Sequence, residues 1–195
     1  RYLFDAFMFL IPRSRRAIRT ESIATQKEDW EYQFNQWFGP DRDLSALDAA
    51  IAATAKRLGP PPANRRIMLS IPYPSPLVKD FGDVDGDGVT EDLSTDFGRK
   101  KVLRWFSDEA RRRFRVAGYK HLTLWGLYWM REDLGPEDGP ICRIAADVVH
   151  AAGLRLLWIP YNGAPGWERW KECGIDVAIL QPNLAFGTWQ NGGAM

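Results

Sequence analysis

The chain has 195 residues, of which 45% are hydrophobic and 26% are charged, a composition typical of a soluble globular domain. Lysine and arginine together number 26 and the acidic residues 25, so the formal net charge is only +1. This balance argues against nucleic acid or an anionic membrane surface as a partner, and no apolar run reaches the roughly 20 residues that a spanning helix needs. We therefore expect a single domain over residues 1–195 that neither binds nucleic acid nor inserts into a membrane.

Five apolar runs predict β-strands, at residues 3–11, 67–72, 121–128, 154–160 and 176–181. Such continuous runs are typical of strands that are buried on both faces of a parallel sheet. A helical pattern that ends in a glycine precedes each of the last four runs, since glycine adopts the left-handed conformation that closes a helix. The closing glycines are Gly59, Gly118, Gly153 and Gly174.

The helical patterns are amphipathic, with apolar residues at intervals of three and four. The first spans residues 44–58 and has Asp43 or Ser45 available as the N-cap. The second runs through residues 102–114, and Gly139 with the proline after it opens the third. Each helix therefore has one face that can be buried against a sheet.

Strands alternating with helices fit either an open doubly wound sheet or part of a (β/α)₈ barrel. No GxGxxG or GxxxxGK[ST] motif follows the first strand, so the nucleotide-binding sheet has no motif to support it. We predict an α/β fold of the (β/α)₈ TIM-barrel type, with the first five βα units present and the C-terminal strands beyond Met195. The start at Arg1, directly before an apolar run, agrees with a piece of a longer protein. An unclosed barrel exposes two strand edges, so we expect this chain alone to be only marginally stable.

Two pairs of residues receive structural roles. Cys142 and Cys173 have no CxxC spacing and no histidine cluster nearby, so we expect buried thiols rather than a zinc site or a disulfide framework. Asp5 and Asp176 lie early in predicted strands, at the end of a barrel where polar residues usually serve stability.

Barrel enzymes carry their active residues at the C-terminal ends of the strands and on the loops that follow. After the second to fifth predicted strands, these positions are rich in aromatic and amide side chains. Aromatic rings stack on the apolar faces of sugars, and amides serve hydroxyl groups as donor and acceptor, so the set indicates a neutral carbohydrate. Each ring alone is equally well explained as a plug of the barrel core. The predicted substrate-binding residues are Tyr73, Tyr128, Trp129, Trp158, Tyr161, Asn162, Gln181 and Asn183.

Glu132 is the candidate catalytic general acid. A carboxylic acid beside Trp129 would be partly desolvated, which disfavours its ionised form, as proton donation to a glycosidic oxygen requires. Glycoside hydrolysis usually needs a second carboxylate, for which Asp133 and Asp80 are the nominees unless the partner lies beyond the C-terminal end. The alternative is that Glu132 forms a surface ion pair with Arg131 or a neighbouring loop.

The segment FGDVDGDGVTED, residues 81–92, resembles the start of an EF-type calcium loop, here extended over residues 81–94. The twelfth position of that loop is Ser94 rather than a bidentate glutamate, and no pair of helices flanks the segment. We therefore expect a static Ca²⁺ clamp of modest affinity, which suits an extracellular or cell-surface protein, against the alternative of a solvated acidic hairpin. The predicted ligands are Asp83, Asp85, Asp87, Val89 and Glu91. No organic cofactor is expected.

Several motifs in this order resemble the DUF4855 family of uncharacterised bacterial proteins. They are FDAFMFL, IPYPSP with FGDVDGDG, LWGLYWMRED, LLWIPYNGAPGWERW and DVAILQPNLAF, which together cover nearly the whole chain. The resemblance implies a TIM-barrel-like domain of secreted or surface proteins, often placed beside carbohydrate-binding modules and suspected of acting on polysaccharide. It supports the fold more than the chemistry, because one barrel hosts many functions.

Three functions follow as hypotheses. The first is a glycoside hydrolase-like enzyme that acts on a polysaccharide or oligosaccharide, with Glu132 as general acid and calcium ordering the acidic loop. The second is a non-catalytic carbohydrate-binding or cell-surface module. The third is a calcium-stabilised structural module whose aromatic ends contact other domains of the same polypeptide. A second carboxylate facing Glu132 would favour the enzyme.

Overall fold

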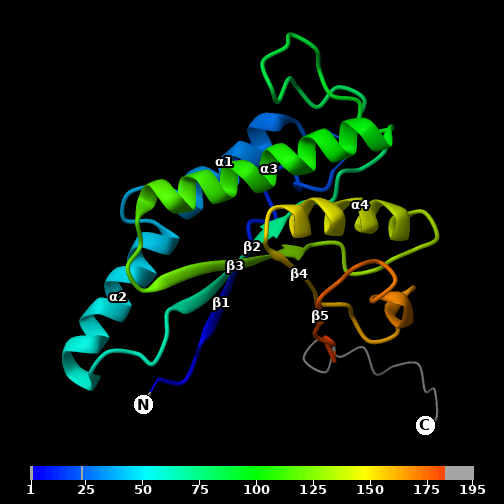
Figure 1. Cartoon of the computed structure of the whole chain (residues 1–195). Helices are drawn as coiled ribbons and strands as arrows, with labels where there is room; N and C mark the ends of the chain where they lie inside the picture. The colour runs from blue at the N-terminus through cyan, green and yellow to red at the C-terminus, as the bar shows by residue number, and fades with distance from the viewer. Residues whose placement is uncertain (1, 23, 183–195) are drawn as a thin grey trace.

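The computed structural model describes residues 2–22 and 24–182. Five parallel strands form one sheet in chain order, and helices connect them, so the chain is a mixed α/β protein whose sheet curls into a half-barrel (Figure 1). The strands are β1 (Ala6–Phe9), β2 (Arg65–Ile71), β3 (Leu122–Trp129), β4 (Arg155–Trp158) and β5 (Val177–Ala178). The helices are α1 (Lys27–Phe38), α2 (Asp43–Leu58), α3 (Asp96–Ala117) and α4 (Asp138–Ala151), with a 3₁₀ turn, η1 (Trp167–Arg169), before β5. None of these described helices is long and apolar enough to cross a bilayer.

Two helices differ from the sequence-based expectation. Helix α1 was not predicted, although Trp30, Phe34 and Trp37 recur at helical spacing and are fully buried. The helix predicted before the fifth strand is wrong, because only the short turn η1 forms there. The strands occupy the predicted places, but β5 is reduced to two residues.

The helix ends follow ordinary capping chemistry with one correction. Helix α2 begins at Asp43 itself, so its N-cap is Arg42 rather than Asp43 or Ser45. Asp43 instead places a negative charge in the first turn, where it complements the helix dipole. Helix α3 ends at Ala117, and Gly118 caps it with a φ of 62°, the left-handed closure that the sequence predicts.

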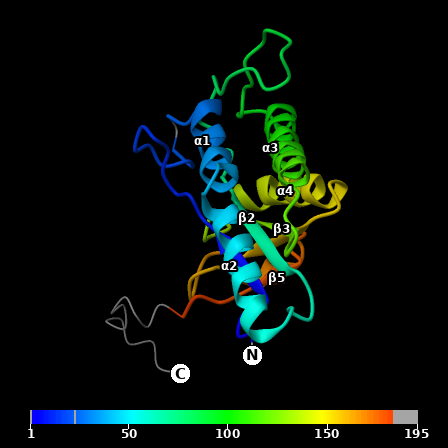
Figure 2. The same ribbon diagram turned by 90° about the vertical axis from the view of Figure 1, so that its left-hand side faces the viewer.

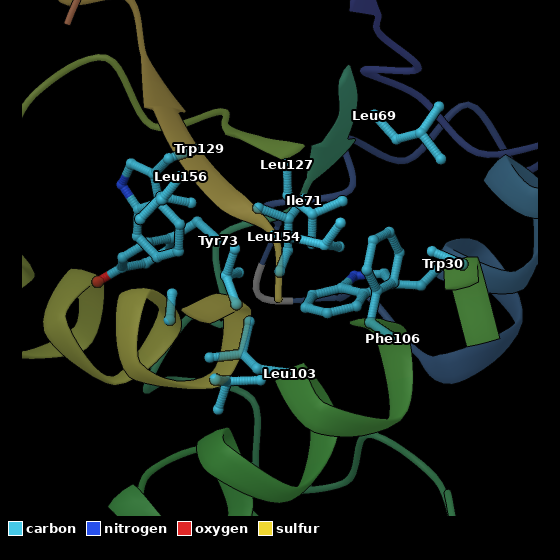
Figure 3. Packing of buried hydrophobic residues seen from close by; sticks show 14 of the residues in the cluster. Trp30, Leu69, Ile71, Tyr73, Leu103, Phe106, Leu127, Trp129, Leu154 and Leu156 are labelled. Carbon is cyan, nitrogen blue, oxygen red and sulfur yellow. The ribbon is translucent and has the colours of Figure 1, made fainter. Parts of the chain in front are cut away.

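The two faces of the sheet belong to different hydrophobic clusters. The face under the helices belongs to the main core, which joins Ile67, Leu69 and Ile71 of β2 to side chains of α1 and α3 such as Trp30 and Phe106 (Figure 3). The opposite, inner face carries a smaller cluster drawn only from the strands and their ends. Its members are Met68, Tyr128 and Leu157, with Ala6, Met8, Trp125, Met130, Ile159 and Val177 packed against them.

A β-bulge in β3 decides which of two adjacent aromatic residues faces which side. Ile67 pairs with Leu124 and the next residue, Met68, pairs with Gly126, so Trp125 is an extra residue in the ladder. A single inserted residue reverses the side-chain alternation. Tyr128 consequently belongs to the inner face and Trp129 to the helix-side core.

Three of the four residues with predicted structural roles, Cys142, Cys173 and Asp176, lie as expected, and the role of Asp5, exposed directly before β1, stays a prediction. Cys142 and Cys173 are buried free thiols, and burial raises the pKa of both. Asp176 accepts a hydrogen bond from the backbone N–H of Leu156 at 2.7 Å and lies 2.8 Å from His150 Nε2. It therefore ties the start of β5 to β4 and to the end of α4.

Candidate functional site

A cavity of about 360 Å³ lies at the C-terminal ends of β1, β3 and β4. Its wall combines carboxylates, arginines and tyrosines from three loops with the inner face of the sheet. The lining residues are Leu10, Pro12, Arg19, Glu21, Tyr128, Met130, Arg131, Glu132, Asp133 and Tyr161. This is the end of a parallel βα sheet at which ligands bind.

The loop after β1 delivers Glu21 to this cavity and is held from both sides. Trp30, fully buried in α1, donates its indole N–H to the carbonyl of Thr20 at 3.0 Å, which fixes the residue directly before Glu21. Asp29 is also buried and accepts hydrogen bonds from the Arg16 guanidinium and, at 2.9 Å, from the backbone N–H of Gln26. The backbone around Glu21 is therefore anchored to the first turns of α1.

The loop after β3 carries Arg131, Glu132 and Asp133 and is fixed to β4. The indole N–H of Trp158 donates to the carbonyl of Arg131 at 2.7 Å. The Arg131 guanidinium lies 3.0 Å from Asp133 Oδ1 and 3.2 Å from Asp138 Oδ2. Arg131 thus pairs with these two carboxylates rather than with Glu132, the partner that the sequence suggested.

The electrostatics of the cavity centre on Glu21, which is partly buried. Burial raises the pKa of its carboxyl, the nearby Arg19 and Arg131 oppose that shift, and the charges of Glu132 and Asp133 add to it. Tyr128 is 3% exposed, and its pKa is raised first by burial and then by the charges of Glu132 and Glu21. Two carboxylates from different loops therefore act on the same buried tyrosine.

Three of the predicted sugar-binding aromatics lie in the core under the helices. Trp129 and Trp158 are fully buried, and Trp129 packs edge-on against Tyr73 with the ring centroids 5.7 Å apart (Figure 3). The Tyr73 hydroxyl donates to Asp138 Oδ1 at 2.7 Å, and this ring borders a neighbouring cavity together with Arg131. Glu132 is exposed, so the desolvation expected from Trp129 does not arise at this carboxylate.

The remaining predicted binding residues divide between the cavity and its surroundings. Tyr161 lines the cavity and forms an isolated parallel bridge with Gln181. Asn162 is exposed, and its backbone N–H donates to the carbonyl of Gln181 at 3.0 Å. Asn183 lies outside the described residues. Asp80, a nominated partner of Glu132, instead accepts a hydrogen bond from Thr90 at 2.6 Å in the acidic loop.

The acidic loop, residues 81–92, projects beyond the N-terminal end of α3 (Figures 1 and 2). The Asp83 carboxylate organises it by accepting backbone N–H groups of Asp85, Gly86 and Gly88 at 3.1, 2.6 and 2.8 Å. The bonds from Gly88 and Gly86 are the main reason that the pKa of Asp83 is lowered. Gly86 and Gly88 have φ of 81° and 83°, a conformation that favours glycine.

The carboxylates of the acidic loop converge on a cation of the chain itself. Lys101 of α3 places its Nζ 2.9 Å from Asp85, 3.1 Å from Asp87 and 2.8 Å from the buried Glu91. Its pKa is raised, chiefly by Glu91. Lys101 thus compensates part of the negative charge of the acidic loop, so a metal ion is not needed for all of that compensation.

A smaller ligand set than the predicted one fits a divalent cation. Carboxylate oxygens of Asp83, Asp85 and Glu91 lie within 4.8 Å of one another, and such hard oxygen donors suit Ca²⁺. Asp87 is outside this group and contacts Lys101. Of the four predicted carboxylate ligands, three therefore converge, and the backbone carbonyl of Val89 stays a prediction.

The family model described as Domain of unknown function (DUF4855) matches residues 1–191. The chain belongs to the DUF4855 family. No curated protein and no solved structure shows significant similarity to it.

The sequence reading missed Glu21 of this DUF4855 domain. The predicted site residues lie at the ends of the second to fifth strands or on the loops that follow them, and none lies on the loop after the first, although β1 ends at the same edge of the sheet. The signal was available, because every loop that follows a parallel strand reaches that edge. Reading the TES stretch at residues 20–22 by that rule would have nominated the carboxylate.

Proposed function

We propose that this DUF4855 domain carries a carbohydrate-processing site of the glycoside hydrolase type in the cavity at its strand ends. The observation that carries the proposal is the convergence of Glu21 with Glu132 and Asp133, which come from the loops after β1 and β3. Glycoside hydrolysis uses two carboxyl groups that flank the scissile bond, and their separation decides the stereochemical outcome. Glu21, which the sequence analysis did not nominate, and the nominated Asp133 are therefore the candidates for the second carboxylate beside Glu132.

The rest of the cavity suits a sugar. Tyr128 and Tyr161 provide aromatic surface, and the exposed amide of Asn162 follows at the rim. Arg19 and Arg131 partly offset the negative charge of the carboxylates, so the lining carries both signs of charge, which agrees with an uncharged polysaccharide or oligosaccharide. Trp129 and Trp158 stabilise the loop and the core in this proposal and are not part of the binding surface.

The release of reducing ends tests the proposal. The natural polypeptide that contains this chain is incubated, with calcium present, with a panel of bacterial and plant polysaccharides. The variant Glu132→Gln and the control variant Glu168→Gln are assayed in parallel. Glu168 is exposed on η1 and lies outside the cavity. We expect release that falls about 100-fold or more in Glu132→Gln and is unchanged in the control.

A non-catalytic carbohydrate-binding module is the second candidate. The direct pairing of Arg131 with Asp133 and Asp138 favours it, since charges that neutralise one another can line a binding surface without doing chemistry. Absence of product together with retained binding to an insoluble polysaccharide would select this candidate over the hydrolase.

We also propose that Ca²⁺ is a structural ion held by Asp83, Asp85 and Glu91. Two observations support this proposal. The carboxylate oxygens of the three residues converge, and Asp83, the first predicted ligand, is held in place by hydrogen bonds from the backbone N–H groups of Gly86 and Gly88. A site with so few carboxylates suits the calcium concentrations outside cells, so we propose an extracellular or cell-surface location. Calorimetric titration with CaCl₂ tests the ion, and absence of binding at millimolar calcium would overturn it.

The half-barrel is proposed to be the first five units of an eight-stranded TIM-type barrel. The inner face offers the apolar cluster of Met68, Tyr128 and Leu157, and β1 and β5 each pair with only one neighbour in the described sheet. Further strands or other domains of the same polypeptide would cover this apolar cluster and the two strand edges. Closure of the barrel predicts that a longer natural polypeptide unfolds more cooperatively and at a higher temperature than this chain, and the absence of both differences would count against it.

A further inference from the structure

The two glutamates of the cavity lie in contrasting environments. Glu21 is partly buried on a loop that Trp30 and Asp29 fix to α1, whereas Glu132 is exposed on the loop after β3. Burial penalises the ionised form of a carboxyl group, while water stabilises it. The pair is therefore asymmetric, as an acid and a carboxylate that work on one bond must be.

The charged groups that face Glu21 come from its own loop and from the loop after β3. Arg19 and Arg131 favour its ionised form, and Glu132 and Asp133 oppose it. Burial has the largest effect, and the net result of all these effects is that the pKa of Glu21 is raised. Its proton is consequently retained to higher pH than in a free glutamate.

We propose that Glu21 is the proton donor of the candidate site and that Glu132 is its ionised partner. This assignment rests on the proposed glycoside hydrolase function. It reverses the sequence-based role of Glu132, because the partly buried position that a general acid requires is occupied by Glu21. The role of Glu132 is then to stabilise positive charge on the sugar.

Each reaction step balances with these two groups. The Glu21 carboxylic acid gives its proton to the glycosidic oxygen as the bond between that oxygen and the anomeric carbon breaks, and the bonding electron pair leaves with the oxygen. The Glu132 carboxylate stabilises the positive charge that develops on the sugar. Water then adds to the anomeric carbon and returns a proton to the Glu21 carboxylate, so one water is consumed and both side chains are restored.

The dependence on the leaving group tests the donor role. A dinitrophenolate departs without a proton, whereas an alkoxide needs one. For glycosides of the sugar that the polysaccharide panel identifies, Glu21→Gln should therefore lower kcat/KM about 100-fold or more with a methyl glycoside but less than about tenfold with the dinitrophenyl glycoside. Glu132→Gln should slow the hydrolysis of both glycosides, and the control Glu168→Gln should slow the hydrolysis of neither. Equal losses on both substrates in Glu21→Gln, or no loss on either, would overturn the assignment.

A titration separates this proposal from the function on which it rests. With isotope-labelled glutamate carboxyl groups followed by NMR, and the Glu21 signal assigned by its absence from Glu21→Gln, the Glu21 midpoint should lie above that of a glutamate in an unfolded peptide. A midpoint no higher than that of the peptide glutamate would overturn the donor role while leaving hydrolysis intact. Inactivity of the unmodified protein on every substrate would overturn the hydrolase function and the donor role with it.

Discussion

The acidic loop and the cavity both gather carboxylates, and both are attached to the first turn of α1. Lys27 donates its backbone N–H to the carbonyl of Phe81 at 2.7 Å and its Nζ to the carbonyl of Asp83 at 2.7 Å, at the edge of the acidic loop. Two residues later, Asp29 holds Arg16 in the loop that carries Glu21. One helical turn therefore supports two charged regions of different construction.

The difference lies in how their charges are compensated. In the acidic loop, neighbours in sequence are brought together by backbone N–H groups, and a single ammonium, Lys101, meets three carboxylates. In the cavity, residues far apart in sequence meet, and Glu21 is both partly buried and close to like charges. Charge that is locally satisfied suits an ordered structural element, whereas an incompletely compensated carboxyl group is typical of a reactive site.

The largest effect is expected from releasing the loop after β1. Asp29→Asn weakens the charge-assisted hydrogen bonds that the buried Asp29 carboxylate accepts from the half-exposed Arg16 and from the backbone N–H of Gln26, so we expect the free energy of unfolding to fall by about 2 to 3 kcal/mol. Denaturant titration measures this change. The matched control is Glu28→Gln, because Glu28 is exposed, lies 3.6 Å from Arg16, and should contribute less than about 0.5 kcal/mol. Equal effects of the two variants would show that Asp29 does not anchor the loop.

A somewhat smaller effect is expected at the loop after β3. Trp158→Phe leaves the carbonyl of Arg131 without its indole donor and creates a small void, which together should cost about 2 kcal/mol. Trp167→Phe is the control, since Trp167 is 55% exposed and should change stability by less than about 0.5 kcal/mol. Hydrogen exchange should quicken in residues 130–135 and stay unchanged in the acidic loop. Unchanged exchange in residues 130–135 would contradict the anchoring role.

The sequence predicted the order of the strands and three of the four described helices, because these depend on periodicity and on closing glycines, and it indicated the family through contiguous motifs. It could not decide between Tyr128 and Trp129, since the bulge at Trp125 exchanges their faces and no local pattern marks it. Lys101 was equally hidden, because it reaches the acidic loop from one turn inside α3. Features that depend on a contiguous motif could therefore be predicted from the sequence. Features that depend on strand register, or on contacts between distant segments, could not.

Calcium binding distinguishes the two regions further. Lys101→Met removes the ammonium that competes for Asp85 and Glu91, so we expect the affinity for Ca²⁺ to rise on the order of tenfold in calorimetric titration. Lys100→Met, an exposed neighbour on α3, is the control and should leave the affinity unchanged. If removal of Lys101 weakened binding instead, its ammonium would be organising the carboxylates rather than competing with the ion.

The smallest effect concerns pH and isolates Glu21. The pKa of this carboxyl is raised in the folded chain, mainly by burial, so the folded state binds its proton more tightly than the unfolded state does. Its contribution to stability is therefore complete below the ordinary glutamate pKa and is lost as the pH rises through the folded value. Glu21→Gln cannot lose a proton, so its free energy of unfolding, relative to that of the unmodified chain, should increase from weakly acid to neutral pH. Urea titrations at several pH values measure this difference, in which contributions from the other carboxylates largely cancel. Parallel curves for the two proteins would mean that burial does not favour the protonated form, and the acidic loop and the cavity would then hold their charges in the same way.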